Sequence, residues 1–176
     1  MAHTVLYIPV PQLEPYIRWR HQHEGPEWLS PEDDHVHAHV TVLGPFVPEA
    51  DLTPEHDADL AALIGGVPAF AFTLREIRVF PTGLVHLRPE PAEPFARLTA
   101  AVAGRYPGHP PYAGEFDPVP HLSLCALAPG RDVPLVREEL ADVLPVRASA
   151  EEVRLVRYAE HGTRTLRRYP LVGSGR

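Results

Sequence analysis

Apolar and polar residues alternate in short runs in the first half of the chain, and prolines separate these runs. Alternation with a period of two is typical of strands, whereas apolar residues three and four apart are typical of helices. We expect a helix from Pro11 to about His23, then a loop, and a second helix that Thr53 caps and Gly65 ends. The patterns predict strands over residues 3–10, 36–43, 69–80 and 84–88.

The second half repeats this order of elements. Phe95, Leu98 and Val102 have helical spacing and predict a helix over 91–106, followed by a Pro/Gly-rich loop over 107–118. The remaining pattern predicts a strand over 119–127, a helix over about 133–143, and strands near 146–158 and 164–171. Helix, strand, helix and hairpin thus occur roughly twice. We expect an α+β fold with two pseudo-two-fold related lobes of antiparallel sheet, outer helices and a central cleft, in one domain over residues 1–176.

Two of the predicted strands carry the same short pattern. His39-Val-Thr-Val42 recurs as His121-Leu-Ser-Leu124, 82 residues later, with a histidine, an apolar residue, a hydroxyl residue and an apolar residue in each. A strand places residues i and i+2 on one face, so each copy presents an imidazole beside a hydroxyl. A single copy is a weak signal, but two copies half a chain apart predict a paired site.

Two such pairs on opposite walls of a cleft suit in-line displacement at phosphorus. A neutral imidazole can take a proton from water while an imidazolium protonates the leaving ribose oxygen, and the ordinary histidine pKa of about 6.5 makes both forms available. The hydroxyls of Thr41 and Ser123 can hydrogen-bond the non-bridging oxygens. We therefore expect His39 and His121 to be catalytic and the two hydroxyls to bind phosphate. The pattern of histidine, apolar residue, hydroxyl residue and apolar residue is absent at His3, His21, His23, His56, His86, His109 and His161.

These residues and their flanks, from Val5-Leu-Tyr-Ile-Pro-Val10 to Pro120-His121, resemble the 2H phosphoesterase superfamily. In particular, they resemble its bacterial group of 2′-5′ RNA ligase-like proteins and RNA 2′,3′-cyclic phosphodiesterases. The resemblance implies a two-lobed fold and opening of a cyclic phosphate to a 2′-phosphomonoester. A ribose hydroxyl in place of water would form a 2′-5′ phosphodiester instead.

Composition excludes several other mechanisms. All 16 basic residues are arginine, so an adenylated lysine, a Schiff base and a Walker-A lysine are impossible. The net charge of −7 argues against a protein that coats long nucleic acid. The single cysteine, Cys125, fits a reducing cytoplasm, and we interpret it as core packing. No apolar run is long enough for a membrane helix and no export signal is present.

Two features leave alternatives open. His35, His37 and His39 lie on one face of the expected strand and suggest zinc, but i and i+4 are about 13–14 Å apart in a strand, too far to share an ion. His37 can instead line the cleft as a polar contact. Residues 154–176 hold six Arg against one Glu. They form either a solvated edge hairpin, which we favour, or a basic wall that attracts phosphate.

We therefore expect a cytoplasmic, monomeric, metal-independent cyclic phosphodiesterase without cofactors. Its partners are an RNA 3′ end or a small cyclic nucleotide, with no role for ATP or a membrane. The alternative is a module that binds a phosphorylated ligand in the same cleft without turnover.

Overall fold

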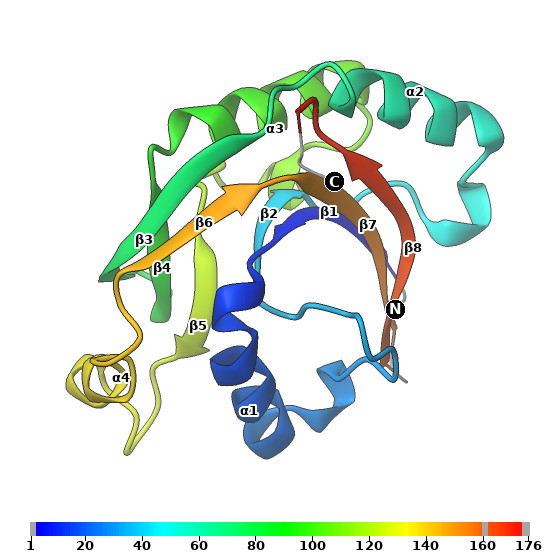
Figure 1. Cartoon of the computed structure of the whole chain (residues 1–176). Helices are drawn as coiled ribbons and strands as arrows, with labels where there is room; N and C mark the ends of the chain where they lie inside the picture. The colour runs from blue at the N-terminus through cyan, green and yellow to red at the C-terminus, as the bar shows by residue number, and fades with distance from the viewer. Residues whose placement is uncertain (1–2, 160–161, 174–176) are drawn as a thin grey trace.

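The computed structural model describes residues 3–159 and 162–173. The described residues form two four-stranded antiparallel sheets with the strand orders β2-β1-β7-β8 and β5-β4-β3-β6 (Figure 1). The first sheet contains β1 (His3–Pro9), β2 (His39–Leu43), β7 (Glu152–Ala159) and β8 (Gly162–Pro170). The second contains β3 (Phe70–Val79), β4 (Leu84–Glu90), β5 (Leu122–Ala126) and β6 (Val146–Ala150). The expected α+β class is confirmed.

Helices flank both sheets, and α2 and α3 lie together at one end of the molecule (Figure 1). The α-helices are α1 (Glu14–Glu24), α2 (Pro54–Ile64), α3 (Glu93–Arg105) and α4 (Val133–Glu139). Short 3-10 turns occur at η1 (Pro11–Leu13), η2 (Pro26–Trp28), η3 (Glu49–Asp51) and η4 (Pro111–Gly114). Helix α2 starts as predicted, because the Thr53 hydroxyl accepts a hydrogen bond from the backbone N–H of His56. None of the helices in the described residues is long and apolar enough to span a membrane.

The two lobes repeat one connectivity. Each lobe has the order strand, helix, motif strand, helix, as β1-α1-β2-α2 and β4-α3-β5-α4. In each, the motif strand pairs with the preceding strand and forms the edge of its sheet. The expected two-lobed arrangement of antiparallel sheets is therefore confirmed.

The first motif strand is shorter than expected. Strand β2 begins at His39, whereas the sequence predicted a strand from residue 36. The backbone N–H groups of His37 and Ala38 donate to the carboxylate of Glu14 in α1, and these donors are therefore not used in a β-ladder. A strand ends where a side chain accepts the hydrogen bonds of its backbone N–H groups. The local apolar pattern does not reveal such a contact.

The single strand expected near residues 146–158 is in fact two strands in different sheets. Strand β6 pairs with β3 in the second sheet, and after Glu151 the chain crosses into the first sheet as β7. The burial pattern changes at this point from alternation in β6 to a continuous buried run over residues 153–156. An edge strand with one wet face gives the first pattern, and a central strand covered on both faces gives the second.

One hydrophobic core runs through both lobes. It includes Leu6 and Val40 of the first sheet and Leu87 and Leu122 of the second. Cys125 is also buried there, in agreement with its interpretation as a packing residue. The core fixes the backs of both motif strands, so that their polar residues face away from it.

Candidate active site

The two motif strands place their residues as the period-two pattern predicts. In β2, Val40 and Val42 are buried while His39 and Thr41 are partly exposed. At the second motif, Leu122 and Leu124 are buried while His121 and Ser123 keep access to solvent. Each imidazole therefore shares a face with its hydroxyl. Neither hydroxyl has a hydrogen-bond partner within residues 3–159 and 162–173, so both are available to a ligand.

The fold brings the two edges together. Strands β2 and β5 contact each other although they belong to different sheets. The ring of Tyr112, which borders the same cavity as His39, stacks on His121 at a centroid distance of 6.4 Å. Three of the four predicted residues thus lie on these two edge strands, and His121 directly precedes β5, which begins at Leu122 rather than at residue 119 as predicted.

Both histidines are held in the same tautomer by the same local geometry. The Nδ1 of His39 lies 2.6 Å from the carbonyl oxygen of His37, and the Nδ1 of His121 lies 2.7 Å from that of Val119. Because a carbonyl oxygen only accepts, each Nδ1 carries a proton. The Nε2 atom of each ring is therefore the one left to exchange a proton with a ligand.

Aromatic rings support both imidazoles. Tyr7, the cross-strand partner of Thr41, stacks on His39 with centroids 4.3 Å apart. In the other lobe, His86 is the cross-strand partner of Ser123, and its ring lies 5.4 Å from that of His121. The sequence did not single out His86, because the motif pattern is absent around it in the chain. Strand pairing nevertheless places it beside Ser123 and His121.

Burial favours the neutral form of both motif histidines. It lowers the pKa of His39 to about 4, against the opposing effect of the hydrogen bond to the carbonyl of His37. Burial also lowers the pKa of His121, against the hydrogen bond to Val119. The site thus has two imidazoles that are mainly neutral at pH 7 and that an anionic ligand would help to protonate.

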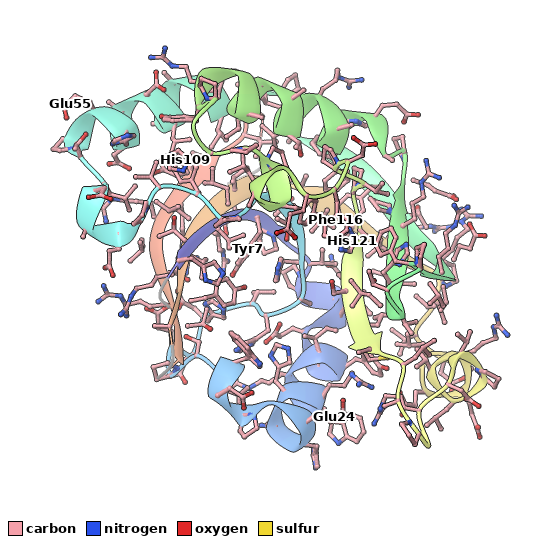
Figure 2. All side chains as sticks on the ribbon, turned by 180° about the vertical axis from the view of Figure 1, so that it is seen from behind. Tyr7, Glu24, Glu55, His109, Phe116 and His121 are labelled. Carbon is pink, nitrogen blue, oxygen red and sulfur yellow. The ribbon has the colours of Figure 1, made fainter. Side chains whose placement is uncertain are left out.

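A cavity of about 870 Å³ opens at His39 and Thr41, and its walls are largely aromatic. Trp28 is 44% exposed and Phe116 is 59% exposed, so two large apolar side chains meet solvent beside the motif. Tyr7, Phe116 and His121 lie in the middle of the molecule, between α1 and the pair formed by α2 and α3 (Figure 2). The further residues along the cavity are His3, Val5, His21, Gly44, Pro45, Tyr112, Ala113, Glu115 and Tyr158.

The loop before the second motif is docked onto the first. The backbone N–H of Tyr112 donates to the carbonyl of Gly44 at 2.8 Å, at the end of β2. Tyr112 and Ala113 both have positive φ angles, 52° and 54°, which cost a non-glycine residue about 1–2 kcal/mol. This strained turn places Tyr112 between the two motifs. The sequence indicated a loop here but no contact with β2.

The structure contradicts the prediction that His35, His37 and His39 lie on one face of a strand. His35 and His37 precede β2 and are buried, so they do not share a strand face with His39. His37 faces Glu14 and the backbone of Ser30, and therefore does not line the cavity. Within the described residues, no three histidine, cysteine or carboxylate side chains are grouped as a metal site would require.

The arginines near the C-terminus are paired with acids. In β8, an edge strand, Arg164, Arg167 and Arg168 contact Glu49, Asp57 and Asp34 respectively. Arg157 of β7 also contacts Glu49. This pairing matches the edge hairpin favoured from the sequence rather than a free basic wall. The residues of this stretch that lie outside the described part of the chain include Glu160, His161 and Arg176.

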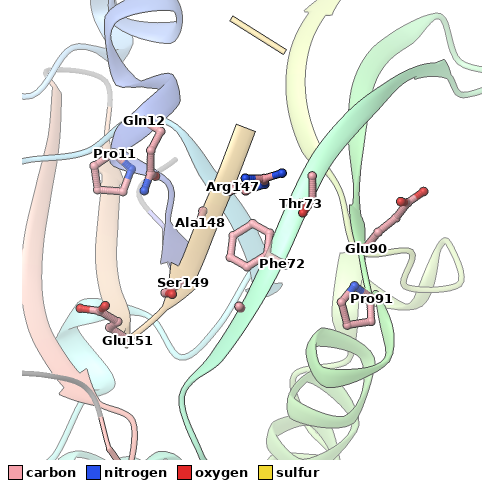
Figure 3. Close-up of a pocket in the computed structure, with 11 residues that line it drawn as sticks. Pro11, Gln12, Phe72, Thr73, Glu90, Pro91, Arg147, Ala148, Ser149 and Glu151 are labelled. Atoms are coloured by element: carbon pink, nitrogen blue, oxygen red, sulfur yellow. The ribbon is translucent and has the colours of Figure 1, made fainter. Parts of the chain in front are cut away.

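A separate cavity of about 600 Å³ opens beside β3 and β6 (Figure 3). Its lining includes Gln12, Thr73, Glu90, Arg147 and Glu151, with both signs of charge and no histidine. None of the predicted site residues borders it. Of the four predicted site residues, His39 and Thr41 line the cavity of about 870 Å³, whereas His121 and Ser123 are not among its lining residues.

Comparison with known proteins is consistent with this geometry. Residues 9–162 match the model of the 2′-5′ RNA ligase superfamily. The fold resembles that of E. coli LigT crystallised with 3′-AMP, at 20% identity and a TM-score of 0.60, over 97% of this chain and 98% of that one. It also resembles TT0787 of Thermus thermophilus, at 21% identity and a TM-score of 0.61, over 98% of this chain and 100% of that one. No curated protein matches the sequence.

The family match covers most of the chain, and the similar structures cover both lobes. This superfamily comprises phosphoesterases and RNA ligases. The chain belongs to the 2′-5′ RNA ligase superfamily of 2H phosphoesterases.

Proposed function

We propose that this protein is a metal-independent cyclic phosphodiesterase that opens 2′,3′-cyclic phosphates at RNA ends or on small nucleotides. The observation that carries the proposal is the matched pair of imidazoles. His39 and His121 stand on facing strand edges, and each has Nδ1 bound to a carbonyl and Nε2 free. Binding alone would require neither a proton acceptor nor a proton donor, whereas hydrolysis requires both.

The reaction follows from these groups. The neutral imidazole of one histidine takes a proton from water as its oxygen attacks phosphorus. The protonated imidazole of the other gives a proton to the ribose oxygen as the P–O bond of the ring breaks. Thr41 and Ser123 hydrogen-bond the non-bridging oxygens, where charge grows in the transition state. The product is a nucleoside phosphomonoester whose ribose carries the freed hydroxyl. In 2′-5′ ligation a ribose hydroxyl takes the place of water on the same path.

The aromatic walls of the cavity support a nucleotide as substrate. Trp28 and Phe116 expose flat apolar surface in the cavity that His39 and Thr41 also line, and a nucleobase stacks well on such surfaces. The related fold of LigT has been crystallised with 3′-AMP, ATP and NADP+, all of which contain adenine and phosphate. We expect ATP to be no energy source here, because the chain has no lysine to adenylate.

Incubation with a nucleoside 2′,3′-cyclic phosphate, followed by ³¹P NMR, tests the proposal. We expect the cyclic-phosphate signal to give way to that of a phosphomonoester. His39→Ala and His121→Ala proteins at equal concentration serve as controls against a contaminating nuclease. Saturable binding without any turnover would instead support the alternative, a module that recognises phosphorylated ligands.

A further inference from the structure

Glu14 of α1 holds the segment that precedes the first motif. Its Oε1 accepts from Nδ1 of His37 at 2.6 Å, and its Oε2 accepts from the backbone N–H groups of His37 at 2.6 Å and Ala38 at 2.9 Å. We call this carboxylate with its three donors the Glu14 clamp. All three donors belong to two consecutive residues, so the clamp fixes both a side chain and the backbone beside it.

The hydrogen bonds determine the protonation state of the clamp. Nε2 of His37 accepts from the backbone N–H of Ser30 at 3.0 Å, so the only ring proton of His37 is on Nδ1 and points to Glu14. Burial raises the pKa of Glu14, but the hydrogen bonds from His37 and Ala38 outweigh it and hold the pKa below its ordinary value. The clamp is thus a carboxylate with a neutral imidazole.

The clamp acts on His39 through one peptide unit. The N–H of Ala38 and the carbonyl of His37 belong to the same planar group and point in opposite directions. Glu14 binds the N–H, and the carbonyl on the other side accepts the Nδ1 proton of His39 at 2.6 Å. The backbone N–H of Val10 donates to the carbonyl of Ala38 at 2.8 Å and fixes the next unit.

The second motif has no equivalent of the Glu14 clamp. The carbonyl that orients His121 belongs to the peptide unit between Val119 and Pro120, and this unit has no N–H because proline lacks one. No carboxylate can hold that peptide in the same way. The clamp therefore distinguishes His39 from His121 in an otherwise symmetric pair.

We propose that Glu14 and His37 are positioning residues that keep His39 in the Nδ1–H tautomer with Nε2 free for proton transfer. The inference rests on the proposed function for its kinetic consequence, but its structural consequence is independent of substrate. Neither residue contacts the reacting atoms. Their effect is to fix the acceptor of the His39 proton, and small displacements of a proton-transfer group reduce rates by about tenfold to a hundredfold.

Long-range ¹H–¹⁵N spectra of the histidine rings, together with kinetics, test the proposal. In the unmodified protein at neutral pH, we expect His39 as the Nδ1–H tautomer. Glu14→Gln replaces one accepting carboxylate oxygen with an NH₂ group, which is a donor. In either orientation of the amide, this NH₂ group meets a second donor, which is either the His37 ring N–H or the backbone N–H groups of His37 and Ala38. We expect a rise in the Nε2–H tautomer of His39, and a fall in kcat of about tenfold to a hundredfold with KM within about twofold.

Glu24→Gln is the matched control. Glu24 lies on the same helix and pairs with Arg20 and Arg131, away from the clamp. We expect this variant to lose stability but to keep the His39 tautomer and kcat. A kcat loss of equal size in both variants with an unchanged tautomer would overturn the proposal.

Two further outcomes would also overturn it. One is an Nε2–H tautomer of His39 in the unmodified protein, which needs no variant to observe. The other is a folded Glu14→Gln protein with an unchanged tautomer and kcat. If Glu14→Gln does not fold, Glu14→Asp replaces it, since it keeps the charge but shortens the reach. If the protein turns over no cyclic phosphate, the proposed function fails while the tautomer measurement still decides this inference.

Discussion

The imidazole of His39 stacks on the phenol ring of Tyr7, with centroids 4.3 Å apart and ring planes 22° apart. Tyr7 is fully buried, and its hydroxyl donates to the carbonyl of Val36 at 2.9 Å. The ring of Tyr7 therefore supports the imidazole of His39 from below, while its hydroxyl bonds to the segment that leads into β2.

We expect Tyr7→Phe to keep the ring stack and lose only the hydroxyl contact. The loss should cost about 1 kcal/mol of stability, and kcat should stay within about threefold. Tyr7→Leu removes the ring that stacks on His39. We expect it to lower the free energy of unfolding by about 3–5 kcal/mol, as for a large aromatic side chain truncated in a core, and to lower kcat further than Tyr7→Phe does. Urea unfolding and steady-state kinetics on both variants distinguish these effects. Equal kcat for the two proteins would show that the stack does not orient His39.

Thr41→Ala and Ser123→Ala should reduce kcat by about tenfold to a thousandfold, because each removes a donor to the charged oxygens in the transition state. Neither hydroxyl has a partner among the described residues, so we expect stability to change by no more than about 0.5 kcal/mol. Thermal unfolding measured beside the kinetics checks both points. Variants that mainly unfold would assign these hydroxyls a structural role.

The pH dependence of kcat/KM should be bell-shaped with a maximum on the acid side of 6.5. Burial lowers the pKa of His39 to about 4 and also lowers that of His121, so the neutral forms persist to lower pH than in free histidine. One ring must be neutral and the other protonated, so the rate falls as pH drops toward the lower value and as it rises above the higher one. The curve is the same whichever histidine is the base. A maximum at about pH 8 or above would contradict this account.

Chelating agents should leave the rate of hydrolysis unchanged. His37 is engaged with Glu14 and Ser30, so it is not free to join His39 around an ion. Kinetics before and after dialysis against EDTA test this expectation. Activity that disappears on chelation and returns with stoichiometric zinc would replace the two-histidine mechanism with metal-assisted hydrolysis.

Local patterns were sufficient to predict that both motifs contain strands with alternating buried and exposed residues, and to predict the capped start of α2. They failed where distant residues determine the outcome. The start of β2 depends on Glu14, which lies 23 residues before His37 and takes the backbone donors of the segment. The position of His86 beside Ser123 depends on strand pairing, which no local pattern contains.

The walls of the cavity were missed for the same reason. Trp28 is 44% exposed at the cavity, and the sequence pattern did not indicate this position. Tyr112 and Phe116 lie in a loop whose composition indicated only a turn, and they reach the site because the loop docks on Gly44. The position of these loop residues at the cavity therefore depends on tertiary contacts that the local sequence does not contain.

The most direct test of the central claim is a double-mutant cycle on His39 and His121, with a nucleoside 2′,3′-cyclic phosphate as substrate. His39→Ala and His121→Ala should each lower kcat by at least about a hundredfold, and the double variant should be little slower than either, because acid and base act as a unit. His23→Ala, on the exposed side of α1, is the matched histidine control and should retain full activity. Near-normal turnover by either single variant in a folded protein would contradict the claim that these two histidines act together on one phosphorus.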